Sequence, residues 1–393
     1  MESIEQMIKR LCPKGVEYVK LGEVCNVLRG KRLTKKELFD DAQYKVFHGG
    51  LSPIGYYTKS NRQAQTVMVI NVGASAGTVG FCEEDFWSSD GCFCLDHNDS
   101  VILPKYLYYY LAEHQIYIQS RVRKAGIPTL DAGAVMDILI PLAPLEIQSR
   151  IVEVLDKMTA LTAELEAELE ARKQQYEYYR NQLLTRFAPN QPVTEYSLGE
   201  LFVFKNGLNA SKEQFGHGTP IVNYVNVYKK CSIVSDDLQG RVELDNKSIE
   251  RYRVQRGDVF FTRTSETQDE IGIASVLLED IEDCVFSGFV LRARPLTNIL
   301  LPEYCKYCFS TNIVRRQIIR LSTMTTRALT NGTSLSEVKI LVPSMQEQQR
   351  IVSILDRFEA LTTDLQSGLP AEIEARRQQY KYYRNKLLTF DAV

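Results

Sequence analysis

Residues 150–165 read RIVEVLDKMTALTAEL, and residues 350–365 read RIVSILDRFEALTTDL. Further along the chain, EARKQQYEYYRNQLLT at 170–185 returns as EARRQQYKYYRNKLLT at 374–389. The offset is 200 residues for the first pair (350 − 150) and 204 for the second (374 − 170). Repeats of about 20–45 residues form solenoids, so this longer period indicates two domains, each followed by the same connector.

The regions between the connectors match only at their edges. VEYVKLGEV (16–24) resembles VTEYSLGEL (193–201), and ILPKYLYYY (102–110) resembles ILLPEYCKYC (299–308), whereas residues 25–100 and 202–298 barely resemble each other. This internal pseudo-two-fold repeat predicts two variable domains and two shared connector helices. The predicted boundaries are 1–142 for the first domain, 143–190 for its connector, 191–342 for the second domain and 343–393 for the second connector.

Apolar and aromatic side chains recur along both connectors in alternating steps of four and three, the spacing of a coiled coil. The positions expected to form the coiled coil and to dock other subunits are Ile151, Leu155, Met158, Leu165, Tyr176, Tyr179, Ile351, Leu355, Phe358, Leu365, Tyr380 and Tyr383. A helix from Leu145 to Phe187 would be roughly 65 Å long at about 1.5 Å per residue, more than a globular core needs. We therefore predict two antiparallel helices that act as a spacer or an assembly surface.

The second connector carries four extra residues (204 − 200) around Ser367-Gly368-Leu369-Pro370. An insertion of four residues is a stutter, which locally unwinds a supercoil. Pro370 is also expected to break or kink the helix, because proline has no N–H to donate.

The variable domains have the pattern of a mixed α/β (α+β) fold. Strands are predicted within 66–72, 138–142, 258–264, 271–278 and 284–293, where β-branched and aromatic residues cluster. Short helices are predicted near 104–120 and 302–319, where Pro104 and Pro302 suit a first helical turn.

The overall charge argues against a protein that coats nucleic acid through a wholly basic surface. The 393 residues include 47 Lys and Arg against 49 Asp and Glu, a net charge of −2, whereas such proteins are usually basic throughout. Any nucleic-acid contact is therefore expected from local patches. The sequence has no run of the roughly 18 apolar residues that a membrane span needs, and nine cysteines, an odd number, favour a reducing cytoplasm.

Motifs for catalysis or metal binding are missing. The sequence contains neither the phosphate-binding G-x-x-x-x-G-K-[ST] loop nor the Asn/Asp-Pro-Pro-aromatic tetrapeptide with which amino-methyltransferases hold a flipped base. Cys305 and Cys308 have a zinc-like spacing, but no second pair accompanies them. We therefore expect neither catalysis nor a metal or cofactor in this chain.

Clusters of cations and hydroxyl groups remain as candidate binding sites. The residues expected to contact DNA are Arg29, Lys31, Arg32, Lys35 and Lys36 in the first domain, and Arg251, Arg253, Arg263, Thr264, Ser265 and Arg327 in the second. Arg and Lys suit phosphates, and Ser and Thr bond phosphates or base edges. A solvated charged face would look the same residue by residue, but one basic loop cluster per neutral domain favours DNA.

Several of these segments resemble specificity (S) subunits of Type I restriction–modification systems, and the likeness covers essentially the full length. Its carriers are ILIPLAPLEIQSRIVEVLD (138–156), KILVPSMQEQQRIVSILD (339–356), the repeated QQYxYYRNxLL, GASAG (73–77) with FWSSDGCFCL (86–95), DVFFTRTSETQDEIGIASVLL (258–278) and VFSGFVLRARP (285–295). One departure is that Leu145-Glu146-Ile147-Gln148 stands where Gln346-Glu347-Gln348 keeps the family's usual Glu-Gln pair.

The resemblance implies two target-recognition domains, each reading one half of a split, asymmetric sequence in double-stranded DNA. The connectors would dock two modification subunits, which carry S-adenosylmethionine and methylate adenine N6. Restriction subunits would add ATP- and Mg-dependent cleavage, so the chain itself would be a non-catalytic DNA-binding subunit. Two alternatives are a specificity subunit of another methyltransferase-linked restriction system and a structural coiled-coil interaction protein. The second alternative would leave the divergence of the two domains unexplained.

Overall fold

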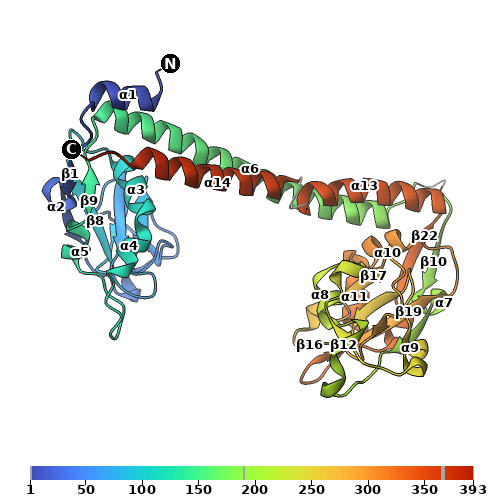
Figure 1. The fold of residues 1–393 in the computed structure, drawn as a ribbon. Coiled ribbons are helices and arrows are strands. Elements are labelled where there is room, and N and C mark those ends of the chain that lie inside the picture. The colour runs from blue at the N-terminus through green and yellow to red at the C-terminus, as the bar shows by residue number, and fades with distance from the viewer. Residues whose placement is uncertain (1, 189–190, 364–367, 393) are drawn as a thin grey trace. The chain divides into compact units, whose positions relative to one another are not determined.

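The computed structural model describes residues 2–188, 191–363 and 368–392. The chain divides into two compact units, Met1–Glu166 with Glu372–Val393 (unit 1) and Ala167–Ala371 (unit 2). Each unit contains one variable domain, the start of the connector that follows it and the end of the other connector (Figure 1).

A four-stranded antiparallel sheet forms the centre of unit 1, in the order β2-β8-β5-β6. The strand β5 is buried from Val67 to Ile70, as its run of apolar residues predicts. The strands are β1 (Tyr18–Lys20), β2 (Cys25–Arg29), β3 (Tyr44–Phe47), β4 (Gly55–Tyr57), β5 (Thr66–Ile70), β6 (Val79–Cys82), β7 (Trp87–Ser88), β8 (Cys92–His97) and β9 (Leu139–Pro141). The helices are α1 (Ile4–Leu11), α2 (Leu21–Val24), η1 (Lys35–Glu37), α3 (Pro104–Glu113), α4 (Gln115–Ser120) and α5 (Ala132–Met136).

The central sheet of unit 2 has the order β11-β19-β15-β17-β13. The strands are β10 (Val193–Ser197), β11 (Phe202–Asn206), β12 (Phe215–Val222), β13 (Ser232–Ile233), β14 (Arg241–Val242), β15 (Val259–Thr262), β16 (Thr264–Ser265), β17 (Ala274–Leu277), β18 (Val285–Phe286), β19 (Val290–Pro295), β20 (Thr323–Met324), β21 (Ala328–Leu329) and β22 (Lys339–Pro343). The helices are α7 (Leu198–Leu201), η2 (Lys212–Gln214), α8 (Tyr224–Lys229), η3 (Ser235–Asp237), α9 (Asn246–Tyr252), η4 (Gln268–Glu270), α10 (Pro302–Cys308), α11 (Asn312–Leu321) and α12 (Gly332–Ser336).

The predicted strands and short helices are confirmed, with two corrections, of which the first is that 258–264, predicted as one strand, forms two, β15 and β16. Pro104 and Pro302 each lie in the first turn of a helix, as predicted. The segment 284–293, predicted as one strand, forms two, β18 and β19. Ser287 and Gly288 turn the chain between them, and the N–H of Val290 donates to the carbonyl of Ser287 (3.1 Å).

The two central sheets share one topology although their sequences barely match. The strands β2, β8, β5 and β6 correspond in order to β11, β19, β15 and β17. Main-chain hydrogen bonds also recur: the N–H of Ser89 donates to Phe47 (3.0 Å), and that of Ser287 donates to Val222 (2.9 Å). Main-chain pairing does not depend on side-chain identity, so the sequence can diverge while the fold persists.

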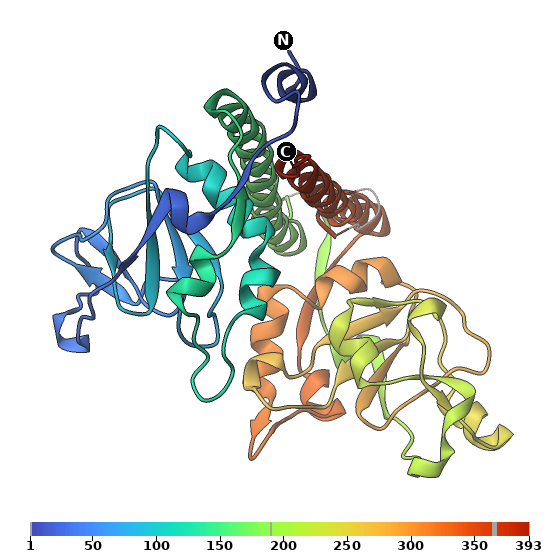
Figure 2. The ribbon, with the colours of Figure 1, turned by 60° about the vertical axis from the view of Figure 1, so that its left-hand side comes forward.

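The connectors form α6 (Leu145–Thr185), α13 (Met345–Thr363) and α14 (Leu369–Leu388). In unit 1, the first part of α6 and the main part of α14 lie side by side (Figure 1 and Figure 2) and join through an Arg377–Glu166 ion pair (2.6 Å). In unit 2, the ring of Tyr179 on α6 lies 5.8 Å from that of Phe358 on α13. The predicted antiparallel pairing is therefore present within each unit.

The break predicted at Pro370 is confirmed, because α14 begins at Leu369 and Pro370 lies in its first turn, where the missing N–H has no intrahelical partner to lose. Ser367 and Leu365 lie outside the described residues. Helix α6 ends at Thr185, two residues before the predicted Phe187.

Each domain rests on a buried apolar cluster built from both connectors. In unit 1, Ile151 and Leu155 of α6 are fully buried with Leu388 of α14. In unit 2, Ile351 and Leu355 of α13 are fully buried with Leu184 of α6. The two ends of unit 1 also join directly. The N–H of Val16 donates to the carbonyl of Asp391 (2.8 Å), and the hydroxyl of Tyr18 donates to the carbonyl of Phe390 (3.1 Å).

One buried glutamine anchors the start of each connector to its domain. The Oε1 atom of Gln148 accepts the N–H of Leu103 (2.9 Å), and its Nε2 donates to the carbonyls of Val101 (3.0 Å) and Ala143 (2.7 Å). Gln348 makes the same three bonds, with Leu301 (2.9 Å), Ile299 (2.8 Å) and Pro343 (3.0 Å). Both side chains are fully buried, so the sequence departure before Gln148 leaves this anchor unchanged.

We predict that Gln148→Leu lowers the free energy of unfolding of unit 1 by about 2–4 kcal/mol, because it leaves a buried N–H and two carbonyls without partners. Trp87 is the one tryptophan in the chain and lies in unit 1, so its fluorescence during urea titration measures this transition. Gln378→Leu, at an exposed position on α14, is the control and should change the free energy by less than about 0.5 kcal/mol. Equal transitions for the two variants would contradict the anchoring role.

Candidate nucleic-acid interface

One end of each central sheet gathers the loops that carry most of the candidate residues. In unit 1, Arg29 at the end of β2 pairs with Phe93, and Ile70 at the end of β5 pairs with Cys92. The loops after β2 and β5 and the turn before β8 therefore leave the sheet together. The matching end in unit 2 is defined by Asn206 paired with Leu291 and by Thr262 paired with Val290. We call this the loop end of each sheet.

The basic loop at 29–36 leaves the loop end of unit 1 with a fixed backbone. A Cβ added to Gly30 would lie 2.1 Å from the carbonyl oxygen of Ser89, so the close approach requires glycine. The N–H of Lys31 donates to Ser88 (2.9 Å), and the indole of Trp87 donates to the carbonyl of Lys31 (2.7 Å).

The side chains of this loop face solvent. Those of Arg29, Lys31, Arg32, Lys35 and Lys36 are all exposed. The carboxylate of Glu37 accepts both the N–H and the hydroxyl of Thr34 (2.8 Å each), and these two bonds lower the pKa of Glu37. A fixed backbone that presents five cations is suited to contacting phosphates.

Unit 2 has an equivalent loop, which runs of charged residues in the sequence do not indicate. Gly207 approaches the carbonyl oxygen of Ser287 as Gly30 approaches that of Ser89, with a Cβ distance of 2.1 Å. The N–H of Ser211 bonds Oε1 of Gln214 (2.9 Å), as Thr34 bonds Glu37. This loop presents Asn206, Asn209, Ser211 and Lys212 as exposed side chains. A signal was available in TKKE (34–37) and SKEQ (211–214), which share the capping pattern four residues after a glycine.

Four of the residues predicted in unit 2 meet at its loop end. Thr264 pairs with Leu329 and Ser265 with Ala328, which places Arg263–Ser265 beside Arg327. Arg263 donates to the carbonyl of Gly288 (2.9 Å), and Arg327 lies 3.4 Å from Glu266. Ser265 is 5% exposed and its hydroxyl accepts the N–H of Thr267 (3.3 Å), so it lies below the surface that Arg327 forms.

Arg251 and Arg253 lie apart from this group, on and just after α9. The carbonyl of Arg253 accepts from Arg294 (2.9 Å), which pairs with Val203 toward the other end of β11. The guanidinium of Arg253 donates to Asp283 (2.8 Å). The structure thus divides the predicted residues of this domain into two groups.

The group around Arg251 includes cations that the sequence analysis did not single out. Lys205, Arg292 and Arg294 lie along β11 and β19 beside α9. Burial, together with the charges of Arg292, Arg251 and Arg294, lowers the pKa of Lys205. Arg294 is held by the fully buried carboxylate of Asp258 (2.6 Å).

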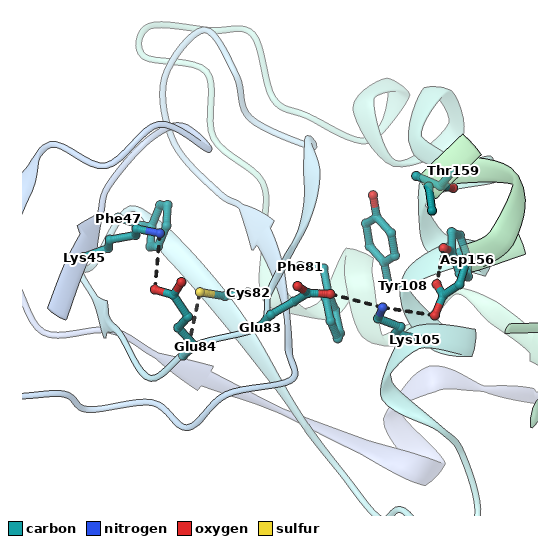
Figure 3. A pocket seen from close by; sticks show the side chains of 12 residues that line it. Lys45, Phe47, Phe81, Cys82, Glu83, Glu84, Lys105, Tyr108, Asp156 and Thr159 are labelled. Carbon is teal, nitrogen blue, oxygen red and sulfur yellow. Dashed lines mark hydrogen bonds and ion pairs between the residues drawn. The ribbon is translucent and has the colours of Figure 1, made fainter. Parts of the chain in front are cut away.

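A cavity of about 620 Å³ lies between the domain and α6 in unit 1 (Figure 3). Lys105 lies between Glu83 and Asp156, 3.1 Å from each, and Lys45 lies 3.2 Å from Glu84. Burial and the bond to Asp156 raise the pKa of Tyr109. Both lysines that line this cavity are paired with carboxylates, which is typical of a structural contact between a domain and its supporting helix.

The predicted connector residues separate into buried and exposed sets. Ile151, Leu155, Ile351 and Leu355 are fully buried in the chain's own cores, so they stabilise the units themselves. Tyr179 and Tyr383 remain about 40% exposed. Their neighbours Tyr178 and Tyr382, which were not predicted, are 59% and 61% exposed. Exposed tyrosines are typical of protein interfaces. The remaining positions, Met158, Leu165, Tyr176, Phe358 and Tyr380, are all half-buried. Tyr380 packs against the core of unit 1, and Tyr176 packs against the core of unit 2.

Within the described ranges, no cluster of three or more His, Cys, Asp or Glu side chains is arranged to hold a metal ion. Cys305 and Cys308 lie buried on α10 as free thiols. Among the helices in the described part of the chain, none is long and apolar enough to span a membrane.

The sequence of this chain is similar to those of a known protein family. The family model for the Type I restriction modification DNA specificity domain matches residues 13–172 and 190–375. The Escherichia coli Type I restriction enzyme EcoR124I/EcoR124II specificity subunit is 32% identical over 99% of this chain and 98% of its own length. A putative Type I specificity subunit of Haemophilus influenzae is 27% identical over 95% and 96%.

Solved structures share the fold. The S subunit of a Type I system from M. genitalium aligns with a TM-score of 0.58 at 17% identity, over 96% of this chain and 97% of that one. A structure from a study of assembly and conformational transition in a Type I system aligns with a TM-score of 0.64, over 96% and 98%. The two family matches, one on each variable domain and connector, establish that this chain belongs to the family of Type I restriction–modification DNA specificity subunits.

Proposed function

We propose that this chain, a non-catalytic DNA-recognition subunit by family, reads a bipartite asymmetric target, one half-site per variable domain. The observation that carries the proposal is that both units have one sheet topology but different side chains at the loop end. A common scaffold supports a common mode of approach to DNA. Different exposed loop residues, such as Arg32 and Lys36 against Asn209 and Glu213, support the reading of different bases.

We further propose that the connectors dock methyltransferase subunits and, with them, restriction subunits. The exposed tyrosines at 178–179 and 382–383 are the candidate contacts, at equivalent places in the two repeats (382 − 178 = 204). S-adenosylmethionine, ATP and Mg would belong to those partners, and the assembly would act in the cytoplasm. The division into 1–142, 143–190, 191–342 and 343–393 remains part of this proposal.

The nearly neutral charge of the chain fits this arrangement, because a shared complex does not need one subunit to supply all contacts to phosphates. The net charge is −2, yet the loop at 29–36 presents five exposed cations. Local patches would orient each domain on the duplex, while partners would add affinity.

Exchange of one domain tests the half-site assignment. Residues 191–340 are replaced by the same region of a relative, and the chain is expressed with its methyltransferase subunit. We expect one half of the methylated motif to change and the other half to stay, because each domain reads its own half. Genome-wide sequencing of methylated adenines measures the motif, and the reciprocal exchange of residues 1–142 is the control. A change in both halves from a single exchange would contradict the assignment.

Loss of the basic loop should weaken binding to all sequences alike. With Lys31, Arg32 and Lys35 changed to Ala, we expect the slope of log K against log salt for duplex binding to shrink by up to about one per lost phosphate contact. The matched control changes Lys9, Arg10 and Lys14, which are exposed cations on and just after α1 of the same unit, away from the loop end. If both triple variants keep the wild-type slope, the loop is only a solvated surface.

A further inference from the structure

A short hairpin at 121–129 projects from the loop end of unit 1. The N–H of Arg123 donates to Thr129 (2.9 Å) and that of Thr129 donates back to Arg123 (3.0 Å). Gly126 has a φ of +79° at the turn, a conformation that favours glycine. The hydroxyl of Thr129 also donates to the carbonyl of Ile127 (2.9 Å). The tip therefore has a defined backbone.

The base of the hairpin is bonded to the loop after β5. The N–H of Gly73 donates to the carbonyl of Pro128 (2.9 Å), and that of Leu130 donates to Asn71 (2.8 Å). Figure 1 shows the hairpin as the teal-green loop that extends past α4 and α5. It thus shares the loop end with the basic loop at 29–36.

The hairpin combines cations with an exposed apolar side chain. Arg121, Arg123 and Lys124 are exposed, and Arg123 lies 3.5 Å from Asp131 at the surface. Ile127 is 72% exposed. Three exposed cations and an exposed isoleucine on one hairpin are complementary to a polyanion with apolar groups in its grooves, which is the surface of double-stranded DNA.

Unit 2 carries the same hairpin, 200 residues later (323 − 123). Thr323 pairs with Leu329 as Arg123 bonds Thr129, and the N–H of Thr330 donates to Arg263 (3.0 Å) as that of Leu130 does to Asn71. Its most exposed apolar side chain is Met324 (49% exposed, against 40% for Leu329), and its cation is Arg327, with 63% of the side chain exposed.

The apolar side chain and the cation have exchanged places between the two hairpins. Met324 stands where unit 1 has Lys124, and Arg327 stands where it has Ile127 (offset 200). Each hairpin therefore keeps one apolar and one cationic side chain at the two positions. The exchange moves the apolar contact to the opposite strand of the hairpin.

We propose that both hairpins are DNA-reading arms, in which Ile127 and Met324 pack against base edges in a groove while the neighbouring cations contact the flanking phosphates. This inference rests on the proposed function and adds two specificity-determining residues to it. An isoleucine or methionine discriminates by contact with the thymine methyl group, whereas the cations contribute equally on every sequence. Because the apolar and cationic side chains have exchanged positions, two hairpins with the same backbone would recognise different bases.

The cations are tested on a mixed-sequence duplex with the full chain, alone and with its methyltransferase subunit. Changing Arg121, Arg123 and Lys124 to Ala should lower the salt slope of binding by about two to three, at about 0.9 per phosphate contact. The control variant with Lys9, Arg10 and Lys14 changed to Ala removes the same charge from α1 and the residues after it and should keep the wild-type slope. Equal slopes for the two variants would overturn the proposal.

The apolar contact is tested by the methylated motif in cells. Ile127→Ala should reduce discrimination about tenfold at one base pair of one half-site, and Met324→Ala should do so in the other half. Ile116→Ala, at an 82% exposed isoleucine on α4 of the same unit, should leave the motif unchanged. A wild-type motif in the Ile127 and Met324 variants overturns the reading arms alone. A wild-type complex that neither binds duplex nor methylates overturns the proposed function, and the arms with it.

Discussion

In both units, the variable domain depends on a pair of packed helices. One helix is the start of the connector that follows the domain, and the other is the end of the second connector. Ile151 and Leu155 share a core with Leu388 in unit 1, and Ile351 and Leu355 share a core with Leu184 in unit 2. Sliding one helix along the other would expose these side chains, at about 25 cal/mol for each Å² of apolar surface. The register of the helices is therefore set inside each unit. Because one buried glutamine bonds each domain to the start of its connector, the loop end has a defined position on the paired helices of its own unit.

The divergence of the two domains follows from where their stabilising interactions lie. Sheet pairing, the close contacts of Gly30 and Gly207, and the bonds of Ser89 and Ser287 all involve the main chain. The exposed cations of the loop at 29–36 take no part in these main-chain contacts, so they can change without loss of the fold. Under the proposed function, this separation would let the recognised sequence change while the helices that dock partner subunits stay the same.

The sequence predicts best where periodicity is strong, and least well where contacts are distant along the chain. The heptad spacing predicts α6 to within two residues, and the proline positions predict α3 and α10. The segment 284–293 is rich in β-forming residues on both sides of Ser287 and Gly288, and it divides where Gly288 meets the loop after β11, a contact that is distant along the chain. Arg253 resembles the other loop arginines until Asp283, thirty residues away, is seen to bind it. The loop at 206–214 carries little charge, so a search for basic runs could not detect it.

The closure of unit 1 by Val16, Tyr18 and residues 390–391 has a consequence for biosynthesis. Unit 2 is one continuous stretch, Ala167–Ala371, whereas unit 1 requires Glu372–Val393. A ribosome that works from the N-terminus makes the first domain early, but releases the helix that completes its core last. The second domain can therefore fold while the first still waits for α14. During that interval Ile151 and Leu155 lack their partner Leu388, which leaves exposed an apolar surface of the kind that favours aggregation.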